Sequence, residues 1–235
     1  KLNKKCTVLI ISSDKSYKPS NKKIPLKEND KIGGLDPYSS SKSAMDIVVN
    51  SYFESYFKNT NILIATARAG NVIGGGDWST NRILPDIINN IYNGKNLILR
   101  NPDHLRPWQF ILEPLIGYLI LIKSLYKQKI NSGEVFNFGP NPKKQYTVIN
   151  LINIMKLKKN IVYKIKKIKN IETKSLILDP KKSSTLLKWK GIYSINEAIN
   201  QTLFWYDNFY KEPNNIYKTS SSQIKKLEKI YKKVI

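Results

Sequence analysis

Short apolar runs alternate with helical patterns along the first 140 residues, and this order constrains the fold more than any other feature of the sequence. Runs typical of buried strands occur at 7–11, 62–67, 96–100 and 135–139, and a further strand is expected at 108–112. Patterns of helical period occur at 37–58, 83–92 and 114–126. The order β, α, β, α, β, β, α, β predicts an α/β fold with a mainly parallel sheet.

The remainder of the chain predicts more helix than strand. Helices are expected near 147–156, 181–188 and 194–210, and a strand near 161–166. Residues 211–235 form a basic tail that predicts a short amphipathic helix. Its expected apolar face consists of Ile224, Leu227, Tyr231 and Val234. We expect this face to pack against the protein, the alternative being a helix for a membrane surface or a partner.

The formal net charge is +23, which first suggests a nucleic-acid partner. Only four of the 40 basic residues are arginine, however, and arginine makes most bidentate contacts with bases and phosphates. Lysine, asparagine, isoleucine and tyrosine are all abundant and share AT-rich codons, so a composition bias explains much of the charge. We expect no nucleic-acid partner and, without a run of about 18 uncharged apolar residues, no membrane span.

Scarce residue types limit the chemistry further. Cys6 is the only cysteine and His104 the only histidine, so we expect no disulfide and no metal site. A reducing cytoplasm suits this composition. All four arginines lie between positions 68 and 106, and ten of the eleven glycines lie between 33 and 139. Special backbone geometry is therefore expected in that region.

The stretch D-P-Y-S-S-S-K places Tyr38 and Lys42 one helical turn apart, just after Pro37. Residues at i and i+4 project from the same face of a helix. An ammonium group beside a phenol favours the phenolate, which can accept a proton from a sugar hydroxyl. A pair of solvated side chains is the alternative, because tyrosine and lysine are both common in this chain.

Polar side chains follow the first expected strand directly, in S-S-D-K-S-Y. Ligands bind beyond the carboxyl ends of strands in an open parallel sheet. Ser12 or Ser13 is a candidate to hydrogen-bond a substrate hydroxyl, while Asp14 and Lys15 place an acid beside a potential base. A capped turn with a solvated ion pair is the alternative.

Glycine and arginine follow the second expected strand. In R-A-G-N-V-I-G-G-G-D-W, three consecutive glycines permit a close approach of a ligand, and Asn71 offers a donor and an acceptor. The later stretch R-N-P-D-H-L-R-P-W-Q-F contains Arg100, Arg106 and Trp108. Guanidinium groups suit a diphosphate.

Five motifs in order carry a family resemblance. They are S-S-D-K-S-Y, D-P-Y-S-S-S-K, A-R-A-G-N-V-I-G-G-G-D-W, L-R-N-P-D-H-L-R-P-W-Q and L-E-P-L-I-G-Y-L. Together they resemble the extended short-chain dehydrogenase/reductases, and within them the CDP-glucose 4,6-dehydratases, across about 7–140. The resemblance is weaker from 141 to 210, and we find none in the tail.

The resemblance implies a lyase that converts CDP-glucose to CDP-4-dehydro-6-deoxyglucose for deoxysugar and surface-polysaccharide synthesis. NAD is the implied cofactor, and a homodimer is the implied assembly. The implied domains are residues 1–80, the remainder of an NAD-binding Rossmann-like domain with the catalytic motifs, and 81–210, mainly a sugar-nucleotide-binding region interleaved with it.

The resemblance also implies the roles of particular residues. Tyr38 is the expected base, and Lys42 is expected to favour its phenolate and to hold the cofactor ribose. Ser13 is expected to bond the sugar C4 oxygen, and Asp14 to protonate the departing C6 hydroxyl. Lys15 stands where dTDP-glucose dehydratases carry glutamate, so it is either a base or an electrostatic stabiliser of the enolate.

Two further groups of residues are implied to bind ligands. The cofactor-binding residues are Ser12, Tyr38, Lys42 and Ala69. The substrate-binding residues are Asn71, Arg82, Arg106 and Trp78. Trp78 and Trp108 have packing in the core as an alternative role.

The family's glycine-rich G-x-x-G-x-x-G motif, which holds the cofactor pyrophosphate, does not occur in this sequence. We therefore expect an N-terminal segment to be absent and this piece alone to bind NAD weakly. Two other functions remain open: another dehydratase or epimerase of the same superfamily, and a non-catalytic remnant. The Asp14–Lys15 pair argues against an epimerase, which expels no hydroxyl.

Overall fold

The computed structural model describes residues 4–20, 23–166 and 174–232, which form two compact units. The first unit comprises Lys1–Gly70, Pro114–Lys144 and Ile171–Gly191, and the second comprises the stretches between and after these. The units therefore alternate along the sequence. The expected division into a cofactor region 1–80 and a substrate region 81–210 concerns binding and stays a prediction.

A three-stranded parallel sheet forms the centre of the first unit. Its order is β1 (Cys6–Ile11), β2 (Ile62–Ala69) and β7 (Glu134–Phe138), so β2 lies between two neighbours. The predicted α/β class with a parallel sheet is confirmed. β2 is buried along its interior, whereas every residue of β1 is at least partly exposed. Among the described residues β1 pairs with β2 alone.

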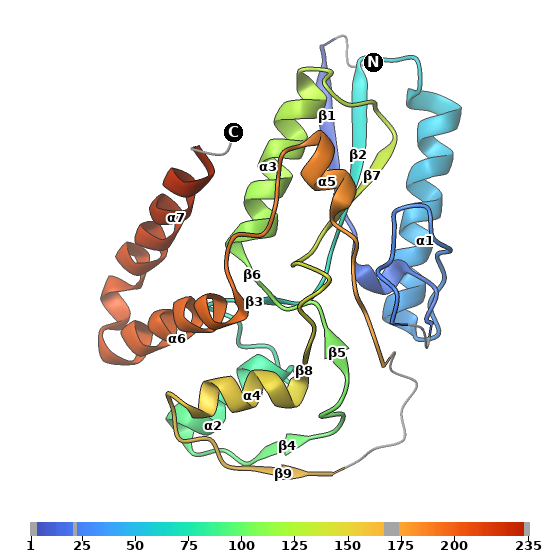
Figure 1. The fold of residues 1–235 in the computed structure, drawn as a ribbon. Helices are drawn as coiled ribbons and strands as arrows, with labels where there is room; N and C mark the ends of the chain where they lie inside the picture. Colours follow the sequence, from blue (N-terminus) through green and yellow to red (C-terminus); the bar gives the residue numbers. More distant parts are fainter. Residues whose placement is uncertain (1–3, 21–22, 167–173, 233–235) are drawn as a thin grey trace. The chain divides into compact units, whose positions relative to one another are not determined.

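Helices lie on both sides of this sheet, with α1 (Pro37–Tyr52) on one side and α3 (Leu112–Tyr126) on the other (Figure 1). α1 continues as a π-helical turn, Phe53–Phe57, so the expected helix 37–58 is nearly complete. The short α5 (Lys181–Leu186) packs near β7. α3 approaches β7 closely at Gly117, which has no side chain. A Cβ at this position would lie 2.5 Å from the Phe138 ring.

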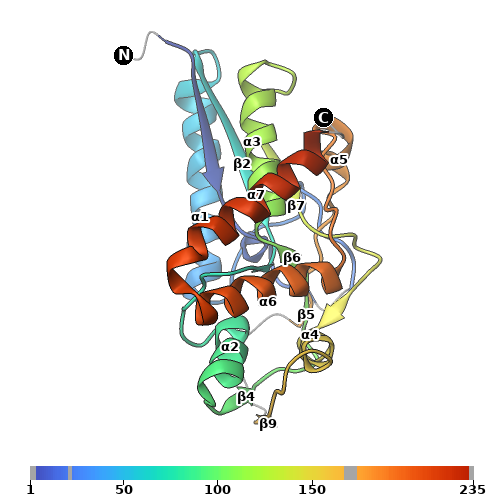
Figure 2. The ribbon, with the colours of Figure 1, turned by 90° about the vertical axis from the view of Figure 1, so that its left-hand side faces the viewer.

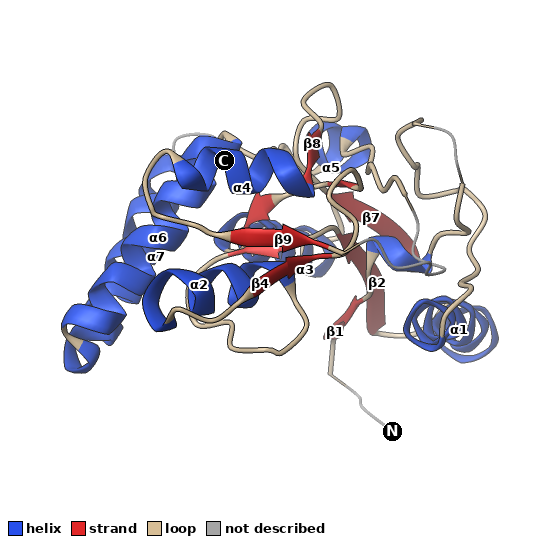
Figure 3. Cartoon of the chain, turned by 90° about the horizontal axis from the view of Figure 1, so that it is seen from below, coloured by secondary structure: helices blue, strands red, loops and turns tan. Residues whose placement is uncertain are grey.

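Three pairs of short strands and four helices make up the described part of the second unit. The strand pairs are β3 (Val72–Ile73) with β6 (Gln109–Phe110), β4 (Leu97–Leu99) with β9 (Tyr163–Ile165), and β5 (Leu105–Arg106) with β8 (Tyr146–Thr147). The helices are α2 (Ile83–Asn93), α4 (Val148–Lys156), α6 (Ile195–Lys211) and α7 (Ile216–Lys232). β4 and β9 lie side by side in Figure 3. The sequence did not predict β3, β5 or β8, since two-residue strands leave no periodic signal.

Local sequence signals set the ends of these helices. Gly94 ends α2 in the left-handed conformation, with φ of 63°. Thr147 with Asn150 caps α4, and Ser194 with Glu197 caps α6, each through reciprocal hydrogen bonds. The apolar faces of these helices then form one buried core, which includes Ile87, Ile88, Leu151, Met155 and Ile199.

The tail forms a helix, as predicted, but its buried face differs from the expected one. The turn Pro213–Asn215 joins α6 to α7, and the two helices pack in a hairpin (Figure 2). Leu227 and Tyr231 are buried as expected, whereas Ile224 is half exposed and Val234 lies outside the described residues. The other buried positions are Thr219 and Gln223, because the buried side follows an i, i+4 row. No helix in the described ranges has the length and apolarity needed to cross a membrane.

Leu151→Ala should destabilise the second unit, because Leu151 is fully buried on α4. The expected loss in the free energy of unfolding is about 2–5 kcal/mol, from lost burial and the cavity left behind. Urea unfolding measures it. Leu157→Ala removes the same atoms from a side chain that is 85% exposed and should leave stability unchanged. Equal losses in the two variants would contradict the burial of Leu151 in the core of this unit.

Candidate functional site

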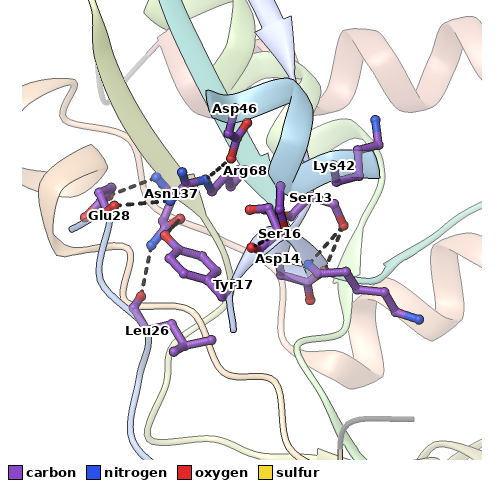
Figure 4. Close-up of polar contacts among 12 residues, drawn as sticks. Ser13, Asp14, Ser16, Tyr17, Leu26, Glu28, Lys42, Asp46, Arg68 and Asn137 are labelled. Atoms are coloured by element: carbon purple, nitrogen blue, oxygen red, sulfur yellow. Dashed lines mark hydrogen bonds and ion pairs between the residues drawn. The ribbon is translucent and has the colours of Figure 1, made fainter. Parts of the chain in front are cut away.

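The carboxyl end of β1 turns sharply into a capped 3₁₀ turn. Ser12 N donates to Ala67 O at 2.8 Å, which holds the chain beside β2. Ser13 caps the turn Asp14–Ser16: its Oγ accepts from Lys15 N at 3.2 Å and donates to Asp14 Oδ1 at 3.0 Å (Figure 4). Ser12, Ser13 and Asp14 are all buried. The turn is thus capped, and it fixes the hydroxyl of Ser13 against the carboxylate of Asp14.

Helix α1 brings Tyr38 and Lys42 to the same end of β1. Lys42 Nζ donates to Ile11 O, the last carbonyl of the strand, at 3.3 Å. Lys15 Nζ lies 5.9 Å from the centroid of the Tyr38 ring. Tyr38 itself is half exposed. The structure therefore brings together Ser13, Asp14, Lys15, Tyr38 and Lys42, five residues that the sequence distributes over two motifs.

Helix α1 buries a polar face against this turn. Its buried residues are Ser39, Ser43 and Asp46. Ser43 Oγ lies 2.8 Å from Ser16 O, which ties the helix directly to the 3₁₀ turn, and 2.9 Å from Ser39 O. A hydrogen bond, and not apolar packing alone, therefore holds α1 against the 3₁₀ turn.

A buried ion pair joins α1 to the sheet. Arg68, in β2, lies with its Nε 2.8 Å from Asp46 Oδ2, and both side chains are less than 5% exposed. Arg68 Nη1 also donates to Glu28 O at 3.1 Å, and its guanidinium carbon lies 4.6 Å from the Tyr17 ring centroid. One guanidinium thus contacts α1, the backbone at Glu28 and Tyr17, the residue that follows the 3₁₀ turn.

Asn137, in β7, completes this polar network and is fully buried. Its Oδ1 accepts from Tyr17 Oη at 2.8 Å, its Nδ2 donates to Leu26 O at 2.9 Å, and its N donates to Glu28 Oε1 at 2.9 Å (Figure 4). Burial raises the pKa of Tyr17 to about 12. Burial also raises the pKa of Glu28, against the lowering effect of its bond from Asn137.

This network was not predicted from the sequence. The one usable signal was Arg68 itself, an arginine at the end of an apolar strand pattern. A charged residue in a buried strand requires a buried partner. The identity of that partner depends on packing between α1 and the sheet, which no local pattern specifies.

The predicted substrate-binding residues all lie in the second unit. Asn71 O accepts from Gln109 N at 3.1 Å, which joins the loop before β3 to β6. Arg82 stands at the start of α2 and forms an exposed ion pair with Asp77 at 3.2 Å. Arg106 is buried and donates to Leu105 O at 2.8 Å. Their role in binding stays a prediction.

Trp78 packs on α6 and also stays half exposed. Its ring centroid lies 4.9 Å from that of Phe209 and 5.3 Å from that of Tyr206. Trp108, by contrast, is buried in the core. Core packing is therefore the role that the structure gives to Trp108, while substrate binding by Trp78 stays a prediction. Within the described ranges, no three side chains among His, Cys, Asp and Glu are grouped to hold a metal ion.

A comparison with protein families finds a match over residues 1–202, to the family described as GDP-mannose 4,6 dehydratase. The chain belongs to this family. The match includes β1, α1 and the loops that carry every predicted site residue, and it ends within α6.

Curated relatives support the same family. The chain is 40% identical to the CDP-glucose 4,6-dehydratase of Salmonella typhimurium over 153 residues, which are 63% of this chain and 43% of that protein. It is 24% identical to the human dTDP-D-glucose 4,6-dehydratase over 219 residues, 86% of this chain and 55% of that protein. The chain thus spans about half the length of the curated relatives that it matches.

Solved structures share the fold. A dTDP-glucose 4,6-dehydratase from Bacillus anthracis, in complex with NAD, aligns with a TM-score of 0.72 at 20% identity, covering 87% of this chain and 62% of that one. A UDP-glucuronic acid 4-epimerase from Bacillus cereus aligns with a TM-score of 0.74 at 21% identity and the same coverage. At these identities the likeness establishes the fold and not the reaction.

Asp36→Ala should remove the N-cap of α1, because Asp36 Oδ1 accepts from Ser39 N at 3.0 Å. The expected loss is about 1 kcal/mol at pH 7. The bonds from Ser39 lower the pKa of Asp36. Its contribution is therefore fully present above the ordinary pKa of aspartate and disappears as the pH falls through the lowered value.

Urea unfolding at a series of pH values measures this difference. Asp36→Asn is the matched control, since asparagine caps equally well and does not titrate. It should keep wild-type stability at pH 7 and keep its cap in acid. An Asp36→Ala variant as stable as the wild type at pH 7 would exclude a capping role.

Proposed function

We propose that this chain carries the catalytic residues of a nucleotide-sugar 4,6-dehydratase that acts on CDP-glucose. The observation that carries the proposal is the convergence of two motifs at the carboxyl end of β1. Lys42 Nζ reaches Ile11 O at 3.3 Å, and Lys15 Nζ lies 5.9 Å from the Tyr38 ring centroid. Family membership supports the dehydratase reaction.

Each of these residues has a chemically suitable task. Tyr38 accepts the proton of the C4 hydroxyl when the sugar is oxidised, and Lys42, one helical turn away, holds the cofactor ribose. Ser13 bonds the C4 oxygen. Asp14 donates a proton to the departing C6 hydroxyl. Lys15 either takes the C5 proton or stabilises the enolate with its positive charge.

Donors at this end of the sheet suit a dinucleotide cofactor. Ser12 Oγ is buried and has no hydrogen-bond partner among the described residues, although buried hydroxyls normally have one. We assign Ser12, Tyr38, Lys42 and Ala69 to the nicotinamide and ribose end of NAD. NAD supplies the hydride acceptor and donor for the reaction. The glycine-rich pyrophosphate cradle of the family is absent from this sequence.

The choice of CDP-glucose follows from the 40% identity to the Salmonella enzyme. Lys15, in place of the glutamate of dTDP-glucose dehydratases, agrees with that choice. Asn71, Arg82, Arg106 and Trp78 are assigned to the nucleotide sugar. An epimerase of the same fold has no hydroxyl to expel, so the buried, hydroxyl-bonded Asp14 favours a dehydratase.

Tyr38→Phe should lower the conversion of CDP-glucose by about 10²-fold or more, because the proton acceptor is lost. Turnover is measured at saturating NAD by mass spectrometry, as the loss of one water from the sugar nucleotide. Tyr217→Phe makes the same change on an exposed tyrosine of α7 and should keep wild-type turnover. Wild-type turnover in Tyr38→Phe would contradict the assigned base. No conversion by the wild-type chain at saturating NAD would contradict the proposed function.

We propose further that α1 forms a homodimer interface with a second copy of the chain. α1 and the turn after it expose Ile47, Val48, Tyr52 and Tyr56, each more than 50%. The rings of Tyr52 and Tyr56 lie 5.6 Å apart. A row of exposed large apolar side chains with few charges between them is typical of an interface.

Ile47→Glu should convert the dimer to a monomer, because a charge is costly to bury in an apolar interface. Sedimentation velocity reports the change in mass. The matched control is Leu157→Glu, which places the same charge on an exposed apolar position of the second unit. A monomeric wild-type chain, or a dimer unaffected by Ile47→Glu, would contradict this interface.

A further inference from the structure

We infer that Arg68 is a positioning residue: its guanidinium sets the position of the Tyr38–Lys42 helix relative to the Ser13–Lys15 turn. Arg68 lies outside both S-S-D-K-S-Y and D-P-Y-S-S-S-K and is buried in β2. This inference deepens the proposed function and rests on it for its catalytic meaning. The contacts of Arg68 from which it is argued all lie within the first unit.

The first contact fixes the helix. Arg68 Nε pairs with Asp46 Oδ2 at 2.8 Å. Asp46 lies one helical turn beyond Lys42, on the buried polar side of α1 with Ser39 and Ser43. A shift of α1 along its axis would break this ion pair, so the pair specifies where the first turn of the helix presents Tyr38.

The second set of contacts fixes the turn and the loop between the motifs. Arg68 Nη1 donates to Glu28 O at 3.1 Å, and the guanidinium lies over the Tyr17 ring. Tyr17 directly follows the 3₁₀ turn. Glu28 lies in the segment between this turn and α1, and a second group also binds it, because the Glu28 carboxylate accepts from Asn137 N at 2.9 Å.

Only arginine suits this place among the basic residues. Its planar fork donates in two directions and stacks on an aromatic ring at the same time. Lysine keeps the charge but donates from a single nitrogen on a flexible stem. Arg68→Lys should therefore preserve the charge balance with Asp46 and lose part of the link to Glu28 and Tyr17.

The test compares Arg68→Lys with the wild-type chain in three measurements. These are kcat and KM for CDP-glucose, the urea midpoint, and hydrogen exchange of peptides covering 12–18, 37–46 and 83–93. Lys58→Met is the matched control, since Lys58 forms an exposed ion pair with Glu54 in the same unit. A third variant, Arg68→Ala, is assayed with and without millimolar guanidinium.

For Arg68→Lys we expect kcat to fall about 10²-fold, because small misplacements of catalytic groups have effects of that size. KM should change less than about 2-fold, since binding groups remain. Exchange should rise at 12–18 and 37–46 but not at 83–93. Guanidinium should restore part of the kcat of Arg68→Ala, and Lys58→Met should match the wild type.

Other outcomes would overturn the inference. An unchanged kcat, or exchange that rises equally in all three peptides, would mean that Arg68 only stabilises the fold. If the wild-type chain lacks turnover, the proposed function fails separately. The exchange measurements then decide alone: a local increase at 12–18 and 37–46 supports the positioning role, and its absence overturns it.

Discussion

The buried ion pair between Arg68 and Asp46 is the interaction on which the arrangement of the first unit depends. Both groups are almost completely removed from water, so each needs the other. Removing one partner of such a pair costs about 3–5 kcal/mol, whereas replacing both by apolar residues is often neutral. The pair therefore says little about the stability of the first unit and more about the position of α1 on the sheet. An apolar contact would tolerate sliding of α1, and a paired charge does not.

This constraint explains why α1 has an unusual distribution of side chains. Serines and an aspartate face the protein, while isoleucine, valine and tyrosine face outward. A helix that packed by the hydrophobic effect alone would have the opposite pattern. The polar side contacts the 3₁₀ turn and β2, and the apolar side is exposed in the part of the chain that the structure describes. One helix thus combines the proposed catalytic residues, a buried polar face and an apolar outer surface.

Much of the fold could be predicted from the sequence because its signals are local. Strand β2 was expected at 62–67 and found at Ile62–Ala69; α2 was expected at 83–92 and found at Ile83–Asn93. The strand-end rule pointed to Ser13 and Asp14, which directly follow β1. Their grouping with Tyr38 and Lys42, which lie on α1, was expected from the family resemblance and not from that rule. The bonds of Arg68 and Asn137 could not be predicted, since their partners lie far away in sequence. The buried side of α7 was misjudged because polar Thr219 and Gln223 gave no apolar signal.

The partly exposed strand β1 has a consequence for handling the protein. Its apolar residues are incompletely covered, and within the described ranges only one of its edges is paired, a geometry that invites strand addition between copies. The net charge of +23 opposes such contacts by long-range repulsion. Salt shortens the reach of that repulsion to about 8 Å at physiological ionic strength. Added salt, which protects many proteins from unwanted electrostatic contacts, should therefore make this chain more prone to self-association.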